Sequence, residues 1–304
     1  MRRIAFFVTT SAAKTRRWLS TEVVRRIVRR TMPEPTRRRL RYQLQRWQGL
    51  SEPQIIARGW ERYARNWKPE QVPQVLPGGR VQYIGDEWTG QENYEDPGKQ
   101  NYGLPLDVVD NFQNYINKNL LDPYLPSGGL TEGLEIGPGG GRLTALLLPR
   151  TKVLHVADTS ETMLEHLKQR FAGVPSLRAY HTDATSLPAL RPASLDCVFS
   201  FDVFVHFEPR MIYWYLRQIE GLLKPGGIGI IHYSNVFTDL GWSRFERNVE
   251  FNLHGRNDFG AFGVMCPPLM GKFLDALQLE VISTNVGLIP RDAIAVFRKR
   301  MNST

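Results

Sequence analysis

From about residue 105 onward, the chain alternates between two hydrophobic patterns. Short apolar runs typical of buried strands alternate with longer segments whose apolar side chains recur every three or four positions, which is typical of helices. The predicted strands cover residues 131–136, 152–157, 177–181, 195–201, 228–233, 279–286 and 292–299. The predicted helices cover 106–121, 141–148, 160–171, 209–223 and 267–277. This order predicts an α/β fold: a doubly wound, Rossmann-like, seven-stranded sheet that ends in an antiparallel strand pair.

The first part of the chain follows different patterns. Residues 14–31 are predicted to form a helix with Trp18 and Leu19 on an apolar face and several arginines on the other, and a second basic helix is expected over 36–48. A capping box at Ser51-Glu52-Pro53-Gln54 begins a third helix. We therefore divide the chain into a basic helical extension (1–68), an irregular segment rich in Pro, Gly and aromatic residues (69–104), and an α/β domain (105–304). Within that domain, 236–263 is expected to be an irregular insertion over the substrate.

Charge separates the extension from the rest of the chain. Residues 1–68 carry 18 Lys and Arg against 4 Asp and Glu, whereas residues 69–304 carry 21 against 26. The two cysteines, Cys197 and Cys266, are too few for a disulfide framework and favour a reducing compartment. No apolar run is long enough to span a bilayer, and the N-terminal apolar patch is too short for a signal peptide. We expect a cytoplasmic protein.

A glycine-rich turn follows the first strand of the domain. Gly137, Gly139 and Gly141 allow a ligand to approach the backbone closely, and Asp158, at the end of the next strand, can accept hydrogen bonds from ribose hydroxyls. A dinucleotide fingerprint requires glycine at position 142, where this chain has arginine, so NAD is disfavoured. A Walker loop is excluded because no Gly-Lys-Ser/Thr follows. The pattern favours a nucleoside without phosphates, although a turn of this kind taken alone can be purely structural.

Five segments in order give the chain a resemblance to the class I S-adenosylmethionine-dependent methyltransferases, small-molecule subgroup. The similar segments are LEIGPGGG (134–141), HVADTSETMLEHLKQR (155–170), HTDATSLP (181–188), LDCVFSFDVFVHF (195–207) and LKPGGIGII (223–231). Each is a weak signal alone, but their shared order and spacing across residues 105–299 is specific. The resemblance implies that S-adenosylmethionine is the cofactor and that the chain is a methyltransferase.

The resemblance also implies a role for individual positions. The glycine turn, including Pro138, lies against the methionine and ribose of the cofactor, while Glu135 orders the methionine ammonium. Asp158 binds the ribose hydroxyls, and Asp183 accepts from the adenine amine, although Asp183 taken alone could be a turn residue or a helix cap. The implied cofactor-binding residues are Glu135, Gly137, Pro138, Gly139, Gly141, Asp158, Thr159, Met163, Asp183, Ala184, Ser200 and Phe201.

The chemistry of methyl transfer indicates a candidate base. The sulfonium methyl is already activated, so the protein must mainly align the nucleophile and exclude water. A hydroxyl nucleophile must in addition lose its proton, which a histidine can accept at neutral pH. His206 occupies a position where similar small-molecule methyltransferases have a histidine, and Asp202 could orient it or contact substrate. His206 could instead hydrogen-bond only its own loop, and His232 is expected to be structural.

The acceptor and the partners are less determined. We expect a small-molecule, glycan or lipid-linked acceptor methylated at oxygen; N- or C-methylation, or a non-catalytic adapter with the same fold, are the alternatives. Candidate acceptor contacts are Trp242, Arg244, His254 and Arg256, and the aromatic stretch 81–103 is either a lid or a packed loop.

No metal site is expected. Residues 14–31 either pack on the domain or contact an anionic membrane surface; nucleic acid is disfavoured because the domain is net acidic. The oligomeric state is left open.

Overall fold

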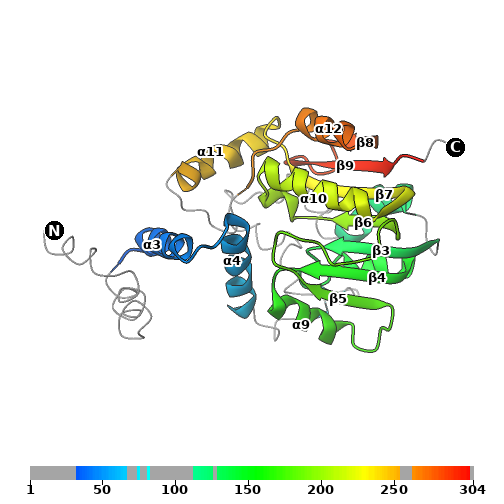
Figure 1. Cartoon of the computed structure of the whole chain (residues 1–304), viewed down its shortest axis with the longest axis horizontal. Coiled ribbons are helices and arrows are strands. Elements are labelled where there is room, and N and C mark those ends of the chain that lie inside the picture. The colour runs from blue at the N-terminus through cyan, green and yellow to red at the C-terminus, as the bar shows by residue number, and fades with distance from the viewer. Residues whose placement is uncertain are drawn as a thin grey trace, which may run out of the picture.

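The computed structural model describes residues 32–66, 74–75, 81–82, 112–125, 129–253 and 262–301. Its centre is a seven-stranded sheet in the order β5-β4-β3-β6-β7-β9-β8 (Figure 1). The strands are β3 (Leu130–Ile136), β4 (Thr151–Asp158), β5 (Leu177–His181), β6 (Leu195–Ser200), β7 (Leu223–Ser234), β8 (Leu279–Asn285) and β9 (Asp292–Lys299). The first five are parallel, and β9 pairs antiparallel with both β7 and β8. The predicted fold class is confirmed.

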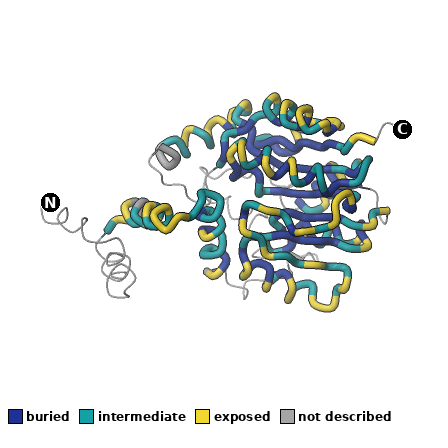
Figure 2. The backbone as a smooth tube through the Cα atoms, viewed as in Figure 1, coloured by how far each residue is buried: buried dark blue, intermediate teal, exposed yellow. Residues whose placement is uncertain are grey.

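Alternate side chains of the central strands pack into two separate cores. Val198 and Ile231 join one core, whereas their neighbours Phe199 and Ile230 join the other, as the two-residue period of a strand requires. The first core contains α10 (Pro209–Leu222) and α12 (Pro267–Ala276). The second contains α6 (Phe112–Ile116), the π-helix Asn117–Leu121, α8 (Thr144–Leu147) and α9 (Glu161–Arg170); α7 (Asp122–Tyr124) follows the π-helix. Figure 2 shows the buried strands between exposed helices. Burial on both faces explains why the parallel strands are continuous apolar runs.

Two helices of the N-terminal extension are described, α3 (Glu34–Trp47) and α4 (Glu52–Asn66). The capping box at the start of α4 is confirmed, because the Ser51 amide donates to Gln54 Oε1 at 3.0 Å and the Gln54 amide donates to Ser51 Oγ at 3.5 Å. In Figure 1, α3 points away from the sheet, whereas α4 lies across the edge at which the parallel strands end. The predicted helix 14–31 lies outside the described residues. So does the aromatic stretch 81–103, apart from β2 (Val81–Gln82), which pairs with β1 (Gln74–Val75).

Several predicted boundaries differ from the structure. The irregular insertion expected over 236–263 is wrong for α11 (Asp239–Leu253), which is helical; exposed Trp242 and the polar residues between its apolar positions obscure the period. β7 begins at Leu223, earlier than predicted, because Leu223 pairs with Leu195 of β6 before the register shifts to Cys197 and Ile228. Gly227 lies in this irregular part, where a Cβ would be 2.9 Å from the Leu195 carbonyl oxygen. The helix predicted over 141–148 is shorter, since α8 covers only Thr144–Leu147 before a 3₁₀ turn, Leu148–Arg150. Within the described residues, no helix combines the length and apolarity needed to cross a bilayer.

Candidate active site

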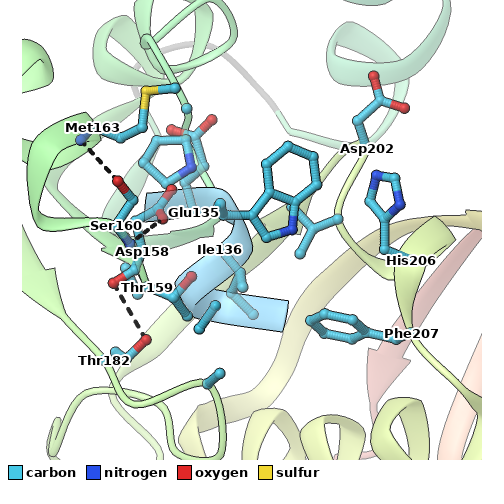
Figure 3. A pocket seen from close by; sticks show the side chains of 18 of the residues that line it. Glu135, Ile136, Asp158, Thr159, Ser160, Met163, Thr182, Asp202, His206 and Phe207 are labelled. Atoms are coloured by element: carbon cyan, nitrogen blue, oxygen red, sulfur yellow. Dashed lines mark hydrogen bonds between the residues drawn. The ribbon is translucent and has the colours of Figure 1, made fainter. Parts of the chain in front are cut away.

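A cavity lies at the carboxyl ends of β3, β4 and β6, where the strand order of the sheet reverses. This is the position at which doubly wound sheets bind ligands. Its walls come from the loops after these three strands, from α10 and from α4 (Figure 3). Among the residues that line the cavity are Pro53, Ile56, Ala57, Trp60, Glu135, Gly137, Pro138, Gly139, Arg142, Asp158, Thr159, Met163, Ala184, Leu187, Phe201, Asp202, His206, Phe207, Met211 and Tyr215.

The glycine turn has a backbone that other residues adopt only with strain. Gly137, Gly139 and Gly141 have φ angles of 70°, 52° and 87°, in the left-handed region. A Cβ on Gly137 would lie 2.2 Å from Val203 Cγ2, and one on Gly141 would lie 2.6 Å from the Phe171 ring. The glycines at 137 and 141 are therefore required by both conformation and space, while Gly139 leaves room on the cavity side.

Two carboxylates lie on this side of the cavity. Glu135 accepts from Thr144 Oγ1 at 2.6 Å, and Asp158 accepts from the Ser160 amide at 2.8 Å. Burial raises the pKa of Glu135 to about 7, and the charge of Asp158 adds to the effect. Burial likewise raises the pKa of Asp158 to about 6, against the opposing hydrogen bonds from the Ser160, Gly139 and Thr159 amides. Two acidic groups that resist ionisation in one cavity are suited to a cationic or hydroxyl-rich ligand.

His206 and Asp202 lie on the other side of the cavity, across from Asp158, Ser160 and Met163 in Figure 3. His206 ends a 3₁₀ turn after β6 and is only 8% exposed. Its ring centroid is 5.1 Å from that of Trp60 and 5.2 Å from that of Phe262, both edge-on. The histidine is therefore held by aromatic contacts at the wall of a shielded cavity.

The Asp202 carboxylate belongs to a charged network behind this wall. It lies 3.7 Å from the Arg142 guanidinium and 3.6 Å from His232 Nδ1. The Asp202 amide donates to His232 Nδ1 at 3.1 Å, which makes Nδ1 an acceptor and places the ring proton on Nε2. Nε2 then donates to Asp292 Oδ2 at 3.1 Å. Both ring nitrogens of His232 are thus hydrogen-bonded, and these contacts hold Asp202 in its strained backbone conformation, with a φ of 60°.

Most of the predicted cofactor-binding residues line the cavity, including Thr159, Met163, Ala184 and Phe201. Three do not. Ser200 is buried and donates to the Ile136 carbonyl at 2.9 Å, joining β6 to β3. Gly141 contacts Phe171 rather than the cavity. Asp183 is exposed, and its Oδ1 accepts from the Thr185 and Ser186 amides and the Ser186 hydroxyl. Those hydrogen bonds lower the Asp183 pKa to about 2.

The candidate acceptor contacts lie apart from the cavity lining or outside the described residues. Trp242 is 50% exposed on α11. Arg244, also on α11, contacts Phe262 rather than the cavity directly. His254 and Arg256 lie outside the described residues.

The sequence analysis missed one wall of the cavity. Pro53, Ile56, Ala57 and Trp60 of α4 line it, although α4 belongs to the extension. Glu61, the next residue, accepts from Ser160 Oγ and Thr162 Oγ1, both at 2.8 Å, at the start of α9. The helical spacing of these apolar residues indicates a buried face but not the surface that it covers.

Comparison with known proteins identifies the domain that contains this cavity. Residues 134–227, which include the glycine turn, Asp158 and His206, match the model of a family described as a methyltransferase domain. The chain carries a class I S-adenosylmethionine-dependent methyltransferase domain. The resemblance seen in the sequence is thus confirmed, and S-adenosylmethionine is the cofactor of this domain.

Other known proteins are similar to parts of this chain. The chain is 29% identical over 105 residues to "Probable thiol methyltransferase 2" of Arabidopsis thaliana, an alignment that covers 33% of this chain and 46% of the relative. The chain therefore matches about half the length of this curated relative. One chain in the complex of the Haloferax volcanii Trm112 methyltransferase activator with a methyltransferase is 15% identical, with a TM-score of 0.50 over 71% of this chain and 98% of that one. Phosphoethanolamine N-methyltransferase 2 of Haemonchus contortus, in complex with S-adenosyl-L-methionine, is 17% identical with a TM-score of 0.49, over 61% and 52%.

The residues of the methyltransferase domain fit its cofactor better than they fit a dinucleotide. Buried Arg142 lies at the helix entrance, with its guanidinium carbon 4.7 Å from the Phe112 ring centroid, and it fills the position where a pyrophosphate would need glycine. Beside the glycine turn the cavity presents the carboxylates of Glu135 and Asp158, while the guanidinium of Arg142, which also lines the cavity, lies 3.7 Å from the Asp202 carboxylate. Among the residues that the structure describes, no group of three or more His, Cys, Asp or Glu side chains is placed to hold a metal ion.

The pKa values of the two carboxylates predict opposite effects of pH on stability and on cofactor binding. Both folded-state values lie above the unfolded ones, so the folded state holds extra protons between about pH 4 and 7, and the unfolding free energy of the ligand-free protein falls as pH rises through that window. For Glu135 the loss is up to about 3 kcal/mol. Binding of the cationic cofactor favours the ionised carboxylates, so its affinity rises over the same window.

Denaturant unfolding across this pH range measures how the unfolding free energy changes with pH, and calorimetry measures how the cofactor affinity changes with pH. Glu135→Gln is the comparison variant, because it removes one of the two titrating groups and keeps an acceptor for Thr144. Equal slopes in wild type and Glu135→Gln would show that Glu135 does not titrate in this window.

Proposed function

We propose that the chain transfers the methyl group of S-adenosylmethionine to an acceptor that enters the same cavity. The observation that supports this most directly is the arrangement of the cavity: a glycine turn and two carboxylates on one side, and a shielded histidine on the other. Isothermal titration calorimetry of the full chain tests it. We expect saturable heat with S-adenosylmethionine and with S-adenosylhomocysteine and none with NADH; the reverse pattern rules out the proposal.

The acceptor atom that we propose is a hydroxyl oxygen. Attack of that oxygen on the methyl carbon forms the C–O bond as the S–CH₃ bond breaks, and it releases neutral S-adenosylhomocysteine. The hydroxyl proton must leave with bond formation, and His206 is the cavity residue suited to accept it at neutral pH. Trp60 and Phe262 hold its ring from two directions, which limits its rotation and keeps water away.

The acceptor side of the cavity is largely apolar. The apolar residues that line the cavity as a whole include Ile56, Leu187, Phe207, Met211 and Tyr215, besides Trp60. Such walls favour an acceptor with a hydrophobic body, so we propose a small molecule or the reactive end of a glycan- or lipid-linked one. Comparison of metabolites with and without the gene, for pairs that differ by one methylene in mass, identifies it.

The oxygen assignment predicts a specific effect of replacing His206. General-base catalysis contributes at least about 100-fold, so His206→Gln lowers kcat by about that factor and removes the acidic limb of its pH profile. Cofactor affinity, measured by calorimetry, stays within about threefold, because the uncharged replacement keeps the size of the cavity wall. His166→Gln, on α9 and outside the cavity lining, is the matched control and keeps wild-type kcat. If the pH profile of His206→Gln matches that of wild type, the acceptor is a nitrogen or carbon nucleophile that needs no base.

A further inference from the structure

Two arginines near the active-site histidine lie over one aromatic ring. The guanidinium carbons of Arg244, on α11, and of Arg291, before β9, lie 4.6 Å and 4.5 Å from the Phe262 ring centroid. The same ring lies 5.2 Å from that of His206. Phe262 therefore connects two arginines to the wall of the methyl-transfer cavity.

Two hydrogen-bond donors on α11, one of them on Arg244, are buried and have no acceptor within the described part of the chain. Arg244 Nε and Asn248 Nδ2 are both inaccessible to solvent, and neither has a hydrogen-bond partner among the residues that the structure describes. They lie four residues apart on α11, so they occupy the same side of the helix one turn from each other. Leaving a buried donor without an acceptor costs about 1–3 kcal/mol, and more for a charged group. Two such donors on adjacent turns are the expected surroundings of an acceptor-rich ligand that completes them.

The charges around Arg244 also favour an anion. Arg291 and Arg247 are close enough to disfavour its protonated form, and Asp292 is the one acidic group among its described electrostatic neighbours. Asp292 Oδ2 already accepts from Arg291 Nε at 2.8 Å and from His232. Burial and then the neighbouring arginines lower the pKa of Arg244 to about 10, which still leaves it cationic at neutral pH. Arg291 also lies 3.9 Å from Asp202 Oδ1, so the three arginines face two carboxylates and keep an excess of one positive charge beside the cavity.

We propose that the face of α11 formed by Arg244 and Asn248 binds an oxyanion of the acceptor, a carboxylate or a phosphate, and so orients the acceptor for methylation beside His206. That the bound oxyanion belongs to the methyl acceptor rests on the proposed function. The binding site itself does not depend on turnover. Arg244 acts by positioning: the oxyanion accepts from its Nε and from Asn248 Nδ2, and Phe262 lies between this site and the reacting oxygen.

Thermal unfolding of the full chain at constant ionic strength tests the site without knowledge of the acceptor. We expect inorganic phosphate or acetate to raise the Tm of the wild-type protein in a saturable way relative to chloride. A response to phosphate alone assigns a phosphorylated acceptor, and a response to acetate alone assigns a carboxylate. Arg244→Met keeps the apolar stem on Phe262 and is expected to weaken oxyanion binding at least about tenfold, as is Asn248→Leu. Absence of a saturable response in wild type overturns the proposal.

Arg217→Met is the matched control, because Arg217 also lies over an aromatic ring, that of Trp214, but on an exposed face of α10. It should retain the oxyanion response; if Arg217→Met and Arg244→Met lose it equally, the effect is general surface charge and the proposal fails. Calorimetry with S-adenosylmethionine on the same samples separates this failure from failure of the proposed function. Arg244→Met should keep the cofactor affinity of wild type, and once the acceptor is known it should raise KM with little change in kcat.

Discussion

Asp158→Asn is expected to bind S-adenosylmethionine about 100-fold more weakly than the wild-type protein, because each charge-assisted hydrogen bond lost costs roughly 1.5–3 kcal/mol. Asp158 ends β4 and lines the cavity, where its ionised carboxylate can accept from two vicinal hydroxyls at once. Its acceptor capacity is already shared with the Ser160 amide at 2.8 Å. An asparagine at this position has a single oxygen, which the Ser160 amide would occupy.

Calorimetric titration of the cofactor at about pH 8, well above the Asp158 pKa of about 6, measures this loss with the carboxylate ionised in the wild type. Repeating the titration near pH 5 should reduce the difference in cofactor affinity between the wild type and Asp158→Asn, since the Asp158 carboxyl of the wild type is then largely protonated. Asp275→Asn, which neutralises an exposed carboxylate on α12, is the control for net charge and keeps wild-type affinity. An Asp158→Asn variant that binds as tightly as wild type would remove Asp158 from the cofactor site.

Glu61→Ala is expected to weaken cofactor binding about tenfold, although Glu61 does not line the cavity. Its carboxylate joins α4 to the start of α9, where it accepts from Ser160 Oγ, from Thr162 Oγ1 and from the Thr162 amide at 3.3 Å. It thereby satisfies a free amide in the first turn of α9 and places negative charge at the positive end of the helix. These hydrogen bonds, with that from Arg65, overcome partial desolvation and lower the Glu61 pKa to about 2. Without these hydrogen bonds, α4, whose Ile56 and Trp60 line the cavity, is no longer held to the start of α9.

Cofactor calorimetry and limited proteolysis of the full chain together test the role of Glu61. In Glu61→Ala we expect weaker binding and faster cleavage within α4, with the domain from β3 onward resistant. Arg65→Ala is the matched control: it removes the 2.7 Å ion pair with Glu61 but leaves every contact to α9, and such exposed pairs contribute at most about 1 kcal/mol. Equal behaviour of the two variants would show that the contact with α9 does not hold α4 in place.

The parts of the molecule that the sequence predicted are those governed by local rules. Buried parallel strands are continuous apolar runs, so the strands of the sheet could be predicted from the sequence. The turn at 137–141 has a left-handed backbone, which favours glycine. The boundaries that were wrong depend on contacts elsewhere. α11 has too broken an apolar face to be recognised, and β7 begins early because Leu223 pairs with Leu195 of β6.

By itself, the sequence determined the fold class, the glycine turn, the position of Asp158 at a strand end and the presence of a histidine after β6, since each follows from neighbours along the chain. Only the tertiary structure decided that α4 forms a wall of the cavity, that His232 carries its proton on Nε2, and that Arg244 and Asn248 have donors without an acceptor among the described residues. The reason is that these properties depend on groups far apart in sequence, and hydrophobic period and motif spacing carry no information about which distant surface a side chain meets.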